Sequence, residues 1–171
     1  AEAISAFLAP KILKGKRVLI HGKSKQAMTA IFKAAAGVGN HGEGVLRRPS
    51  LREIHFIPEK PYVAPGTLRQ TLLCEEVIDI VDEENVGGMI RTLGLERAVE
   101  AAGGLDHEHE NWDAILSLGE QKLLVIARLL LAAPDFAFLD RIQSALSDEQ
   151  ISLVMKLLCA SKITCINLGK P

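Results

Sequence analysis

Cysteines are few in this chain of 171 residues, and they do not suggest a disulfide framework. The three residues, Cys74, Cys159 and Cys165, lack the spacing that is typical of metal ligands. Their odd number and the apolar neighbours of Cys159 and Cys165 indicate reduced, buried thiols in a cytosolic setting. A redox or metal role for these thiols is therefore not expected.

Long hydrophobic runs are also missing, and none approaches the roughly 20 residues that cross a bilayer. The longest candidate, residues 123–133, is interrupted by Arg128. The first residues, Ala1 to Ile4, lack the basic segment of a signal peptide. Any association with a membrane is therefore expected to come from another segment or another chain.

An excess of positive charge is absent as well, since the formal net charge is −1. This balance does not support a nucleic-acid partner, which requires a basic surface. The hydrophobic content of 48% is ordinary for a globular protein. A chain of this length is sufficient for one well-buried domain, and we expect a single domain over 1–171.

Short apolar runs alternate with helical patterns along the chain. The predicted strands are 17–21, 54–57, 136–140 and 163–168, and the predicted helical segments are 27–36, 67–102, 122–133 and 148–160. This alternation predicts an α/β fold with a largely parallel sheet. The long helical segment between the second and third strands is expected to form a lobe on one side of the sheet.

Ligands of parallel sheets bind at the carboxyl ends of the strands. The loops that follow His21, Ile57, Asp140 and Leu168 should therefore meet at one site. Among the residues near that site, the stretch Leu116–Gln121, with the sequence LSLGEQ, is the most informative. It precedes an apolar helix and then a strand that ends on the carboxylate Asp140, which is the order found in the ATP-binding domains of ABC transporters.

Further segments extend this resemblance from about Lys14 to the end of the chain. Phe56–Tyr62 and Gly66–Arg69 are similar to the region after the second strand in peroxisomal fatty-acyl half-transporters (subfamily D) and their bacterial relatives. Gly104–Asp106 and Asn111–Trp112 match the region before the signature loop of the same group. The resemblance implies a P-loop NTPase (RecA-like) fold, with a core over 14–66 and 129–171 and a helical lobe over about 67–128.

The resemblance also implies segments that this chain does not show. An N-terminal β-subdomain with an aromatic residue that stacks on adenine would precede the first strand, but no Tyr or Trp precedes Gly22. Helices would also follow Pro171. We expect both ends to be truncated relative to the family.

The segment that resembles a phosphate-binding loop runs from Gly22 to Thr29. Gly22 and Thr29 fit the pattern G-x-x-x-x-G-K-[ST], but Ala27 replaces a glycine and Met28 replaces the lysine. A lost charge-assisted contact to phosphate weakens binding by roughly 1.5–3 kcal/mol. Residues here that are expected to face a nucleotide are Gly22, Lys23, Ser24, Lys25 and Thr29. The alternative is an ordinary strand–turn–helix with a basic turn.

Three more positions depart from the catalytic pattern of the family. Glu59 replaces a glutamine, Arg141 replaces the glutamate that polarises water, and Lys170 replaces a histidine. A guanidinium cannot accept a proton, so a general base is excluded at Arg141. Together with Met28, these changes predict that ATP hydrolysis at this chain's own site is lost. Asp140 is retained, and the resemblance implies that it binds Mg²⁺ together with Thr29.

The signature loop, in contrast, is intact. In dimers of this family the loop of one domain covers the ATP held by the other, and the Ser117 hydroxyl and Gly119 N–H at the start of a helix would face the γ-phosphate. The alternative is a simple helix N-cap with Glu120 early in the helix. The expected nucleotide-binding residues of this loop are Leu116, Ser117, Leu118, Gly119, Glu120 and Gln121.

Three hypotheses follow for the function. The first is a degenerate ATP-binding domain that donates its signature loop to the composite ATP–Mg²⁺ site of a second such domain, as homo- or heterodimer. Its coupling to a transmembrane domain would place it on the cytosolic face of a peroxisomal or bacterial inner membrane, for transport of a fatty-acyl or other lipid-like substrate. The second is an active ATPase in which Lys25 and Glu59 replace the missing groups. The third is a structural or regulatory module that does not bind nucleotide.

Overall fold

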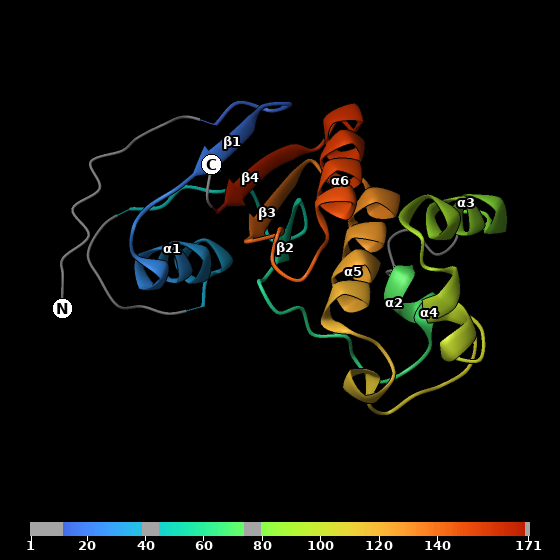
Figure 1. Ribbon diagram of the computed structural model, residues 1–171. Coiled ribbons are helices and arrows are strands. Elements are labelled where there is room, and N and C mark those ends of the chain that lie inside the picture. Colours follow the sequence, from blue (N-terminus) through green and yellow to red (C-terminus); the bar gives the residue numbers. More distant parts are fainter. Residues whose placement is uncertain (1–11, 39–44, 74–79, 170–171) are drawn as a thin grey trace.

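A computed structural model describes residues 12–38, 45–73 and 80–169 of the chain. Its elements are β1 (Arg17–Ile20), α1 (Lys25–Ala36), β2 (Ile54–Ile57), α2 (Leu68–Leu72), α3 (Glu83–Leu93), α4 (Glu96–Ala101), the 3₁₀-helix η1 (Trp112–Ala114), α5 (Leu118–Ala132), β3 (Phe136–Asp140), α6 (Asp148–Ala160) and β4 (Thr164–Leu168). Figure 1 shows a sheet at the centre with helices on both sides.

The sheet has four strands in the order β1-β4-β3-β2, and every pairing is parallel. The prediction of an α/β fold with a parallel sheet is therefore confirmed. The central strands β3 and β4 are in register from Phe136 opposite Thr164 to Asp140 opposite Leu168. This register brings Asp140 and the end of β4 to the same edge of the sheet.

Two apolar clusters cover the two faces of the sheet. On one face α1 contributes Met28 and Phe32, which pack against Phe138 of β3 and Ile166 of β4. On the other face α5 and α6 pack against residues such as Leu139, which alternate with those of the first cluster along β3. Side chains of a strand point alternately to opposite faces, so the short strands supply both clusters.

The helices α2, α3 and α4 lie beyond α5 and belong to the helical lobe between β2 and β3 (Figure 1). The expected continuous helical pattern over 67–102 is broken into α2, α3 and α4. Asp82 caps the start of α3, and Gly94 ends it with a left-handed backbone at φ 66°. Because α5 contacts α2 and α3 as well as β2 and α6, it joins the lobe to the sheet.

The prediction of buried thiols is correct for one cysteine and wrong for another. Cys165 lies on the central strand β4 and is buried, and this burial raises the pKa of its thiol. Cys159 is exposed on α6 because Val154 and Leu158 occupy the positions of that helix that face the core. Cys74 lies outside the described residues.

The described residues contain no helix that is both long and apolar enough to cross a membrane.

Candidate functional site

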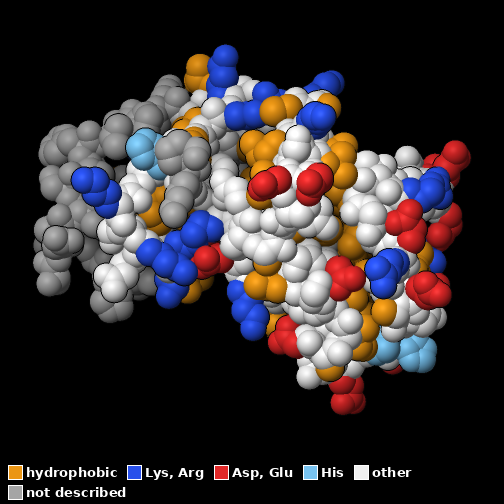
Figure 2. Space-filling model, in the orientation of Figure 1, with side chains coloured by type: hydrophobic (Ala, Val, Ile, Leu, Met, Phe, Trp, Pro, Cys, Tyr) orange, Lys and Arg blue, Asp and Glu red, His pale blue; other side chains and the backbone are white. Residues whose placement is uncertain are grey.

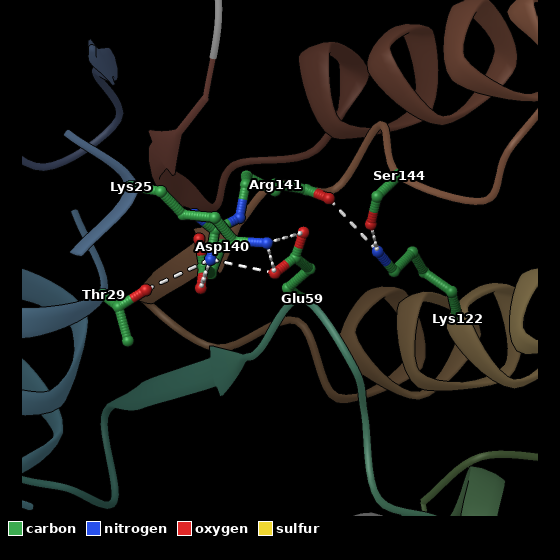
Figure 3. A network of polar contacts seen from close by, with 7 residues as sticks. All are labelled: Lys25, Thr29, Glu59, Lys122, Asp140, Arg141 and Ser144. Atoms are coloured by element: carbon green, nitrogen blue, oxygen red, sulfur yellow. Dashed lines mark hydrogen bonds and ion pairs between the residues drawn. The ribbon is translucent and has the colours of Figure 1, made fainter. Parts of the chain in front are cut away.

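The loops after β1, β2 and β3 meet at the carboxyl edge of the sheet, as predicted. They bring together Lys25 and Thr29 of α1, Glu59 after β2, and Asp140 with Arg141 at the end of β3 (Figure 3). The start of the loop after β4 lies at the same edge, because the Gly169 N–H donates to the Ile20 carbonyl at 3.2 Å. Lys170 lies outside the described residues.

The segment that resembles a phosphate loop is mostly helical. α1 starts at Lys25, two residues earlier than predicted, because the Ser24 hydroxyl caps it by accepting from the Ala27 N–H at 3.2 Å. The Met28 N–H donates to the Ser24 carbonyl at 3.2 Å. The backbone donors of Ala27 and Met28 are therefore used within the first turn of α1.

Met28 turns away from the edge of the sheet. Its side chain is 7% exposed and belongs to the cluster under α1, where a lysine ammonium would be costly to bury. Lys25 and Lys33 instead line a groove along α1, with a volume of about 630 Å³. Figure 2 shows one group of Lys and Arg side chains next to α1 and another along the upper border of this face, with acidic side chains over the centre and the right of the molecule.

Arg141 lies at the centre of the site. Its Nη2 atom donates to Thr29 Oγ1 at 3.2 Å and to Asp140 Oδ2 at 3.0 Å, and it lies 3.0 Å from Glu59 Oε2 (Figure 3). The resemblance implies that the oxygens of Thr29 and Asp140 are ligands of Mg²⁺. In this structure both accept hydrogen bonds from Arg141 instead.

The pKa values of the two carboxylates in the site are shifted in opposite directions. Burial raises the pKa of Asp140, although the positive charge of Arg141 acts in the opposite direction. For Glu59, burial also acts to raise the pKa, but the hydrogen bond from Lys25 and the charge of Arg141 outweigh it and lower the pKa. Lys25 Nζ lies 3.2 Å from Glu59 Oε2, so Glu59 has two cationic partners.

Lys122 is a residue of the site that sequence reasoning missed. It lies within the apolar run of α5 and is fully buried, and burial lowers its pKa. Its ammonium donates to the Arg141 carbonyl at 3.1 Å and to Ser144 Oγ at 2.6 Å. A charged residue at an apolar position of a helix was the available signal, because such a residue is rarely buried without partners.

The signature loop forms the start of α5. Ser117 is the N-cap, and its hydroxyl donates to Glu120 Oε2 at 2.7 Å while accepting from the Glu120 N–H at 3.3 Å. This capping box agrees with the alternative reading of the loop and does not occupy the Leu118 and Gly119 N–H groups. A Cβ at Gly119 would lie 2.7 Å from the Ala145 carbonyl oxygen, so glycine is required for this close approach.

The six residues of the signature loop differ in exposure. Ser117 and Leu118 are exposed, and Gly119 and Glu120 are half-buried, so the N-terminus of α5 is open to solvent. Leu116 and Gln121 are buried, and the Gln121 amide donates to the Leu116 carbonyl at 3.0 Å. This buried hydrogen bond from Gln121 stabilises the backbone of the signature loop.

The parallel sheet with a helical insertion and a signature helix is the fold of an ABC-type ATP-binding domain. A bacterial Atm1-family ABC exporter with ATP bound superposes with a TM-score of 0.74, at 20% identity, over 94% of this chain and 30% of the exporter. This likeness concerns the fold alone. No protein-family model matches the sequence.

The homologues of the chain are ATP-binding proteins of ABC transporters, D family members among them. An uncharacterized ABC transporter ATP-binding protein of Synechocystis is 33% identical over 95% of this chain and 24% of its own length. The human lysosomal cobalamin transporter ABCD4 is 30% identical over 95% of this chain and 28% of its own length. The chain thus spans about a quarter of the length of these relatives.

Proposed function

We propose that this chain is a degenerate ATP-binding domain that no longer hydrolyses ATP at its own site and donates its signature loop to the ATP of a second domain. The homologues support ATP, with Mg²⁺, as the ligand of the dimer. In this proposal the composite site takes its phosphate loop and metal from the partner domain. The residues Ser117 to Glu120 of this chain cover the nucleotide from the opposite side.

The observation that carries the proposal is a contrast between two surfaces. At the carboxyl edge of the sheet, Arg141 is bonded to the oxygens of Thr29, Asp140 and Glu59. At the N-terminus of α5, in contrast, Ser117 and Leu118 are exposed, and the capping box of Ser117 and Glu120 does not use the Leu118 and Gly119 N–H groups, so this helix end can meet an anion. A chain with this pair of surfaces can assist a second site more readily than it can hydrolyse ATP itself.

An active ATPase with a rearranged site is less well supported. Glu59 would have to act as the base, but its pKa is lowered by Lys25 and Arg141, although burial acts to raise it. A carboxylate with a lowered pKa is a weaker base, and Lys25 is already engaged with it at 3.2 Å. Loss of turnover on Glu59→Gln in the isolated chain would support this alternative.

The wider role follows from the same proposal. The relatives are about four times as long as this chain, and their names include transporters of the D family. We expect a transmembrane domain as the second partner, with this chain on the cytosolic face of a peroxisomal or bacterial inner membrane. A fatty-acyl or other lipid-like substrate remains the proposed cargo, and the third hypothesis, a module without nucleotide, remains the competitor.

The donation of the loop can be tested with the ATP-binding domain of the Synechocystis relative, once its own ATPase rate is established. Addition of this chain should raise that rate, and Ser117→Arg should remove the increase because it places a bulky cation at the helix end. Removing one contact that stabilises transition-state charge typically lowers a rate by about 10²–10³-fold. Ser117→Thr keeps the cap and should retain most of the increase.

Thr92→Arg is the matched control, because Thr92 is exposed on α3 and its hydroxyl donates within that helix to the Gly88 carbonyl. This variant should stimulate as well as the unmodified chain. If Ser117→Arg stimulates equally, the loop does not meet the nucleotide. If calorimetry with Mg-ATP gives no saturable heat for the mixture beyond that of the partner alone, the module without nucleotide is correct.

A further inference from the structure

Three oxygen atoms from three distant segments meet at one nitrogen of Arg141. Thr29 Oγ1 comes from α1, Glu59 Oε2 from the loop after β2, and Asp140 Oδ2 from the end of β3. All three lie within 3.2 Å of Nη2 (Figure 3). Two carboxylates and a hydroxyl are hard oxygen donors, the type that Mg²⁺ and Mn²⁺ select.

The space between these three oxygens is occupied by the Arg141 guanidinium, so a divalent ion cannot bind there. Magnesium requires ligand oxygens at about 2.0–2.1 Å in a nearly octahedral arrangement, and it would have to occupy the volume of the guanidinium. The negative charge is also already matched, because Glu59 and Asp140 face the cations Arg141 and Lys25, and Lys122 adds a third positive charge nearby. A divalent ion would add like charge to a poorly solvated place, since the Asp140 side chain is 5% exposed.

The backbone of Arg141 is fixed in a way that keeps its side chain in this place. Its N–H donates to the Leu168 carbonyl at 2.7 Å, and its carbonyl accepts from Lys122 Nζ at 3.1 Å and from the Ser144 N–H at 3.0 Å. The residue has a left-handed φ of 46°, which non-glycine residues rarely adopt. These contacts from β4, α5 and the following turn hold the residue from three sides.

We propose that Arg141 is an internal cation that replaces a divalent metal at the Thr29–Glu59–Asp140 oxygens. The chain accordingly binds no Mg²⁺ at these oxygens, and the charge of the two carboxylates is neutralised by the protein itself. This property belongs to the chain alone and does not depend on donation of the signature loop to a partner.

Removal of the guanidinium charge should convert the same oxygens into a metal site. Asp140 Oδ1 is buried and has no hydrogen-bond partner among the described residues, so it is a further free ligand atom. Arg141→Met keeps an unbranched apolar stem that is shorter than arginine, and it removes the guanidinium and its charge. Mn²⁺ is the probe, and the free ion is measured by electron paramagnetic resonance in the absence of nucleotide.

The unmodified chain should show no saturable Mn²⁺ binding. Arg141→Met should gain a saturable site, with an affinity at least about tenfold above any residual binding of the unmodified chain, because the repulsion between Mn²⁺ and the guanidinium is removed. The double variant Arg141→Met with Asp140→Asn should lose the gain. Arg141→Lys keeps a cation and should remain without metal. Arg128→Met is the matched control, since Arg128 is exposed on α5, away from the carboxylates.

Two results would overturn the proposal. One is saturable Mn²⁺ binding by the unmodified chain that Asp140→Asn abolishes. The other is a folded Arg141→Met variant, verified by its circular dichroism and melting curve, that gains no site. If Arg141→Met does not fold, Arg141→Gln serves as the second neutral variant, with the same two criteria.

Discussion

At the scale of single residues, Lys122 shows how a buried charge can organise a loop. Its ammonium bridges the Arg141 carbonyl and Ser144 Oγ, so it ties α5 to the turn that carries Arg141. Burial lowers its pKa, which means that the charged form is less stable there than in water. The hydrogen bonds and the packing of its four-carbon stem must offset this cost.

Truncation of Lys122 should therefore be costly. Lys122→Ala leaves a cavity at a fully buried position and removes the donor to two acceptors, so we expect a loss of about 2–4 kcal/mol in the free energy of unfolding. Lys122→Met fills the cavity and should recover at least half of that loss. Urea titration of both variants measures the difference. Equal stability of the two variants would show that the stem contributes nothing.

The two described cysteines should react differently with a thiol reagent. Cys159 is exposed on α6, and Cys165 is buried on β4 with a raised thiol pKa due to burial. In the native protein a disulfide reagent should modify Cys159 rapidly, whereas Cys165 should react only as the domain unfolds. Cys159→Ser removes the fast phase and isolates the slow one. A fast phase that persists in this variant after Cys74→Ser would contradict the burial of Cys165.

At the scale of elements, the N-terminus of α5 is set by its contact with the turn after β3. A side chain at Gly119 cannot fit without a shift, because its Cβ would lie 2.7 Å from the Ala145 carbonyl. That carbonyl belongs to a backbone residue in a left-handed conformation, with φ 65°, so it has little freedom to move away. The signature loop and the turn are therefore packed closely against each other at this point.

Gly119→Ala should destabilise the domain by about 1–3 kcal/mol through this overlap. Gly88 provides the matched control, because it lies inside α3 and a Cβ there meets nothing within 4 Å. Gly88→Ala should instead stabilise by about 0.5–1 kcal/mol, since alanine is the better helix former. Thermal melts of both variants measure these two changes in stability. A stabilising Gly119→Ala would mean that the two segments are not in contact.

The elements themselves were largely predictable, because runs such as 54–57 and 136–140 are short, mostly apolar and bounded by charged residues or proline. The division of the lobe into separate helices could not be predicted, since α3 ends where the backbone of Gly94 becomes left-handed. In the site, the unusual residue types Met28, Glu59 and Arg141 could be recognised in the sequence. The direction of the Arg141 side chain could not, because its three partners come from segments far apart in the chain.

At the scale of the whole molecule, Arg69 joins three parts of the lobe. Its guanidinium contacts Asp106 in the loop before the signature, with Nε to Oδ1 at 2.6 Å, and it also pairs with Glu83 at the start of α3. The hydrogen bond from Arg69 lowers the pKa of Asp106. The pair therefore contributes stability above the unfolded pKa of Asp106, near 3.8, and loses it as the pH falls through the lower folded value.

Arg69→Met should consequently lower the melting temperature at neutral pH, and the difference from the unmodified chain should shrink as the pH falls below about 4. Arg97→Met is the control, because Arg97 is exposed on α4. Melting curves of both proteins between neutral and acidic pH measure this difference in melting temperature. A difference that stays constant over the whole range would assign the effect to packing of the side chain instead of charge.

Finally, β1 forms one border of the sheet, and β4 is its partner on a single side among the described residues. Its side chains are exposed or half-buried, and Leu19 is 43% exposed. A border strand with an apolar exposed residue is a template for edge-to-edge pairing with another chain. At high protein concentration the isolated domain should therefore tend to form aggregates through this strand, and Leu19→Lys should improve its solubility.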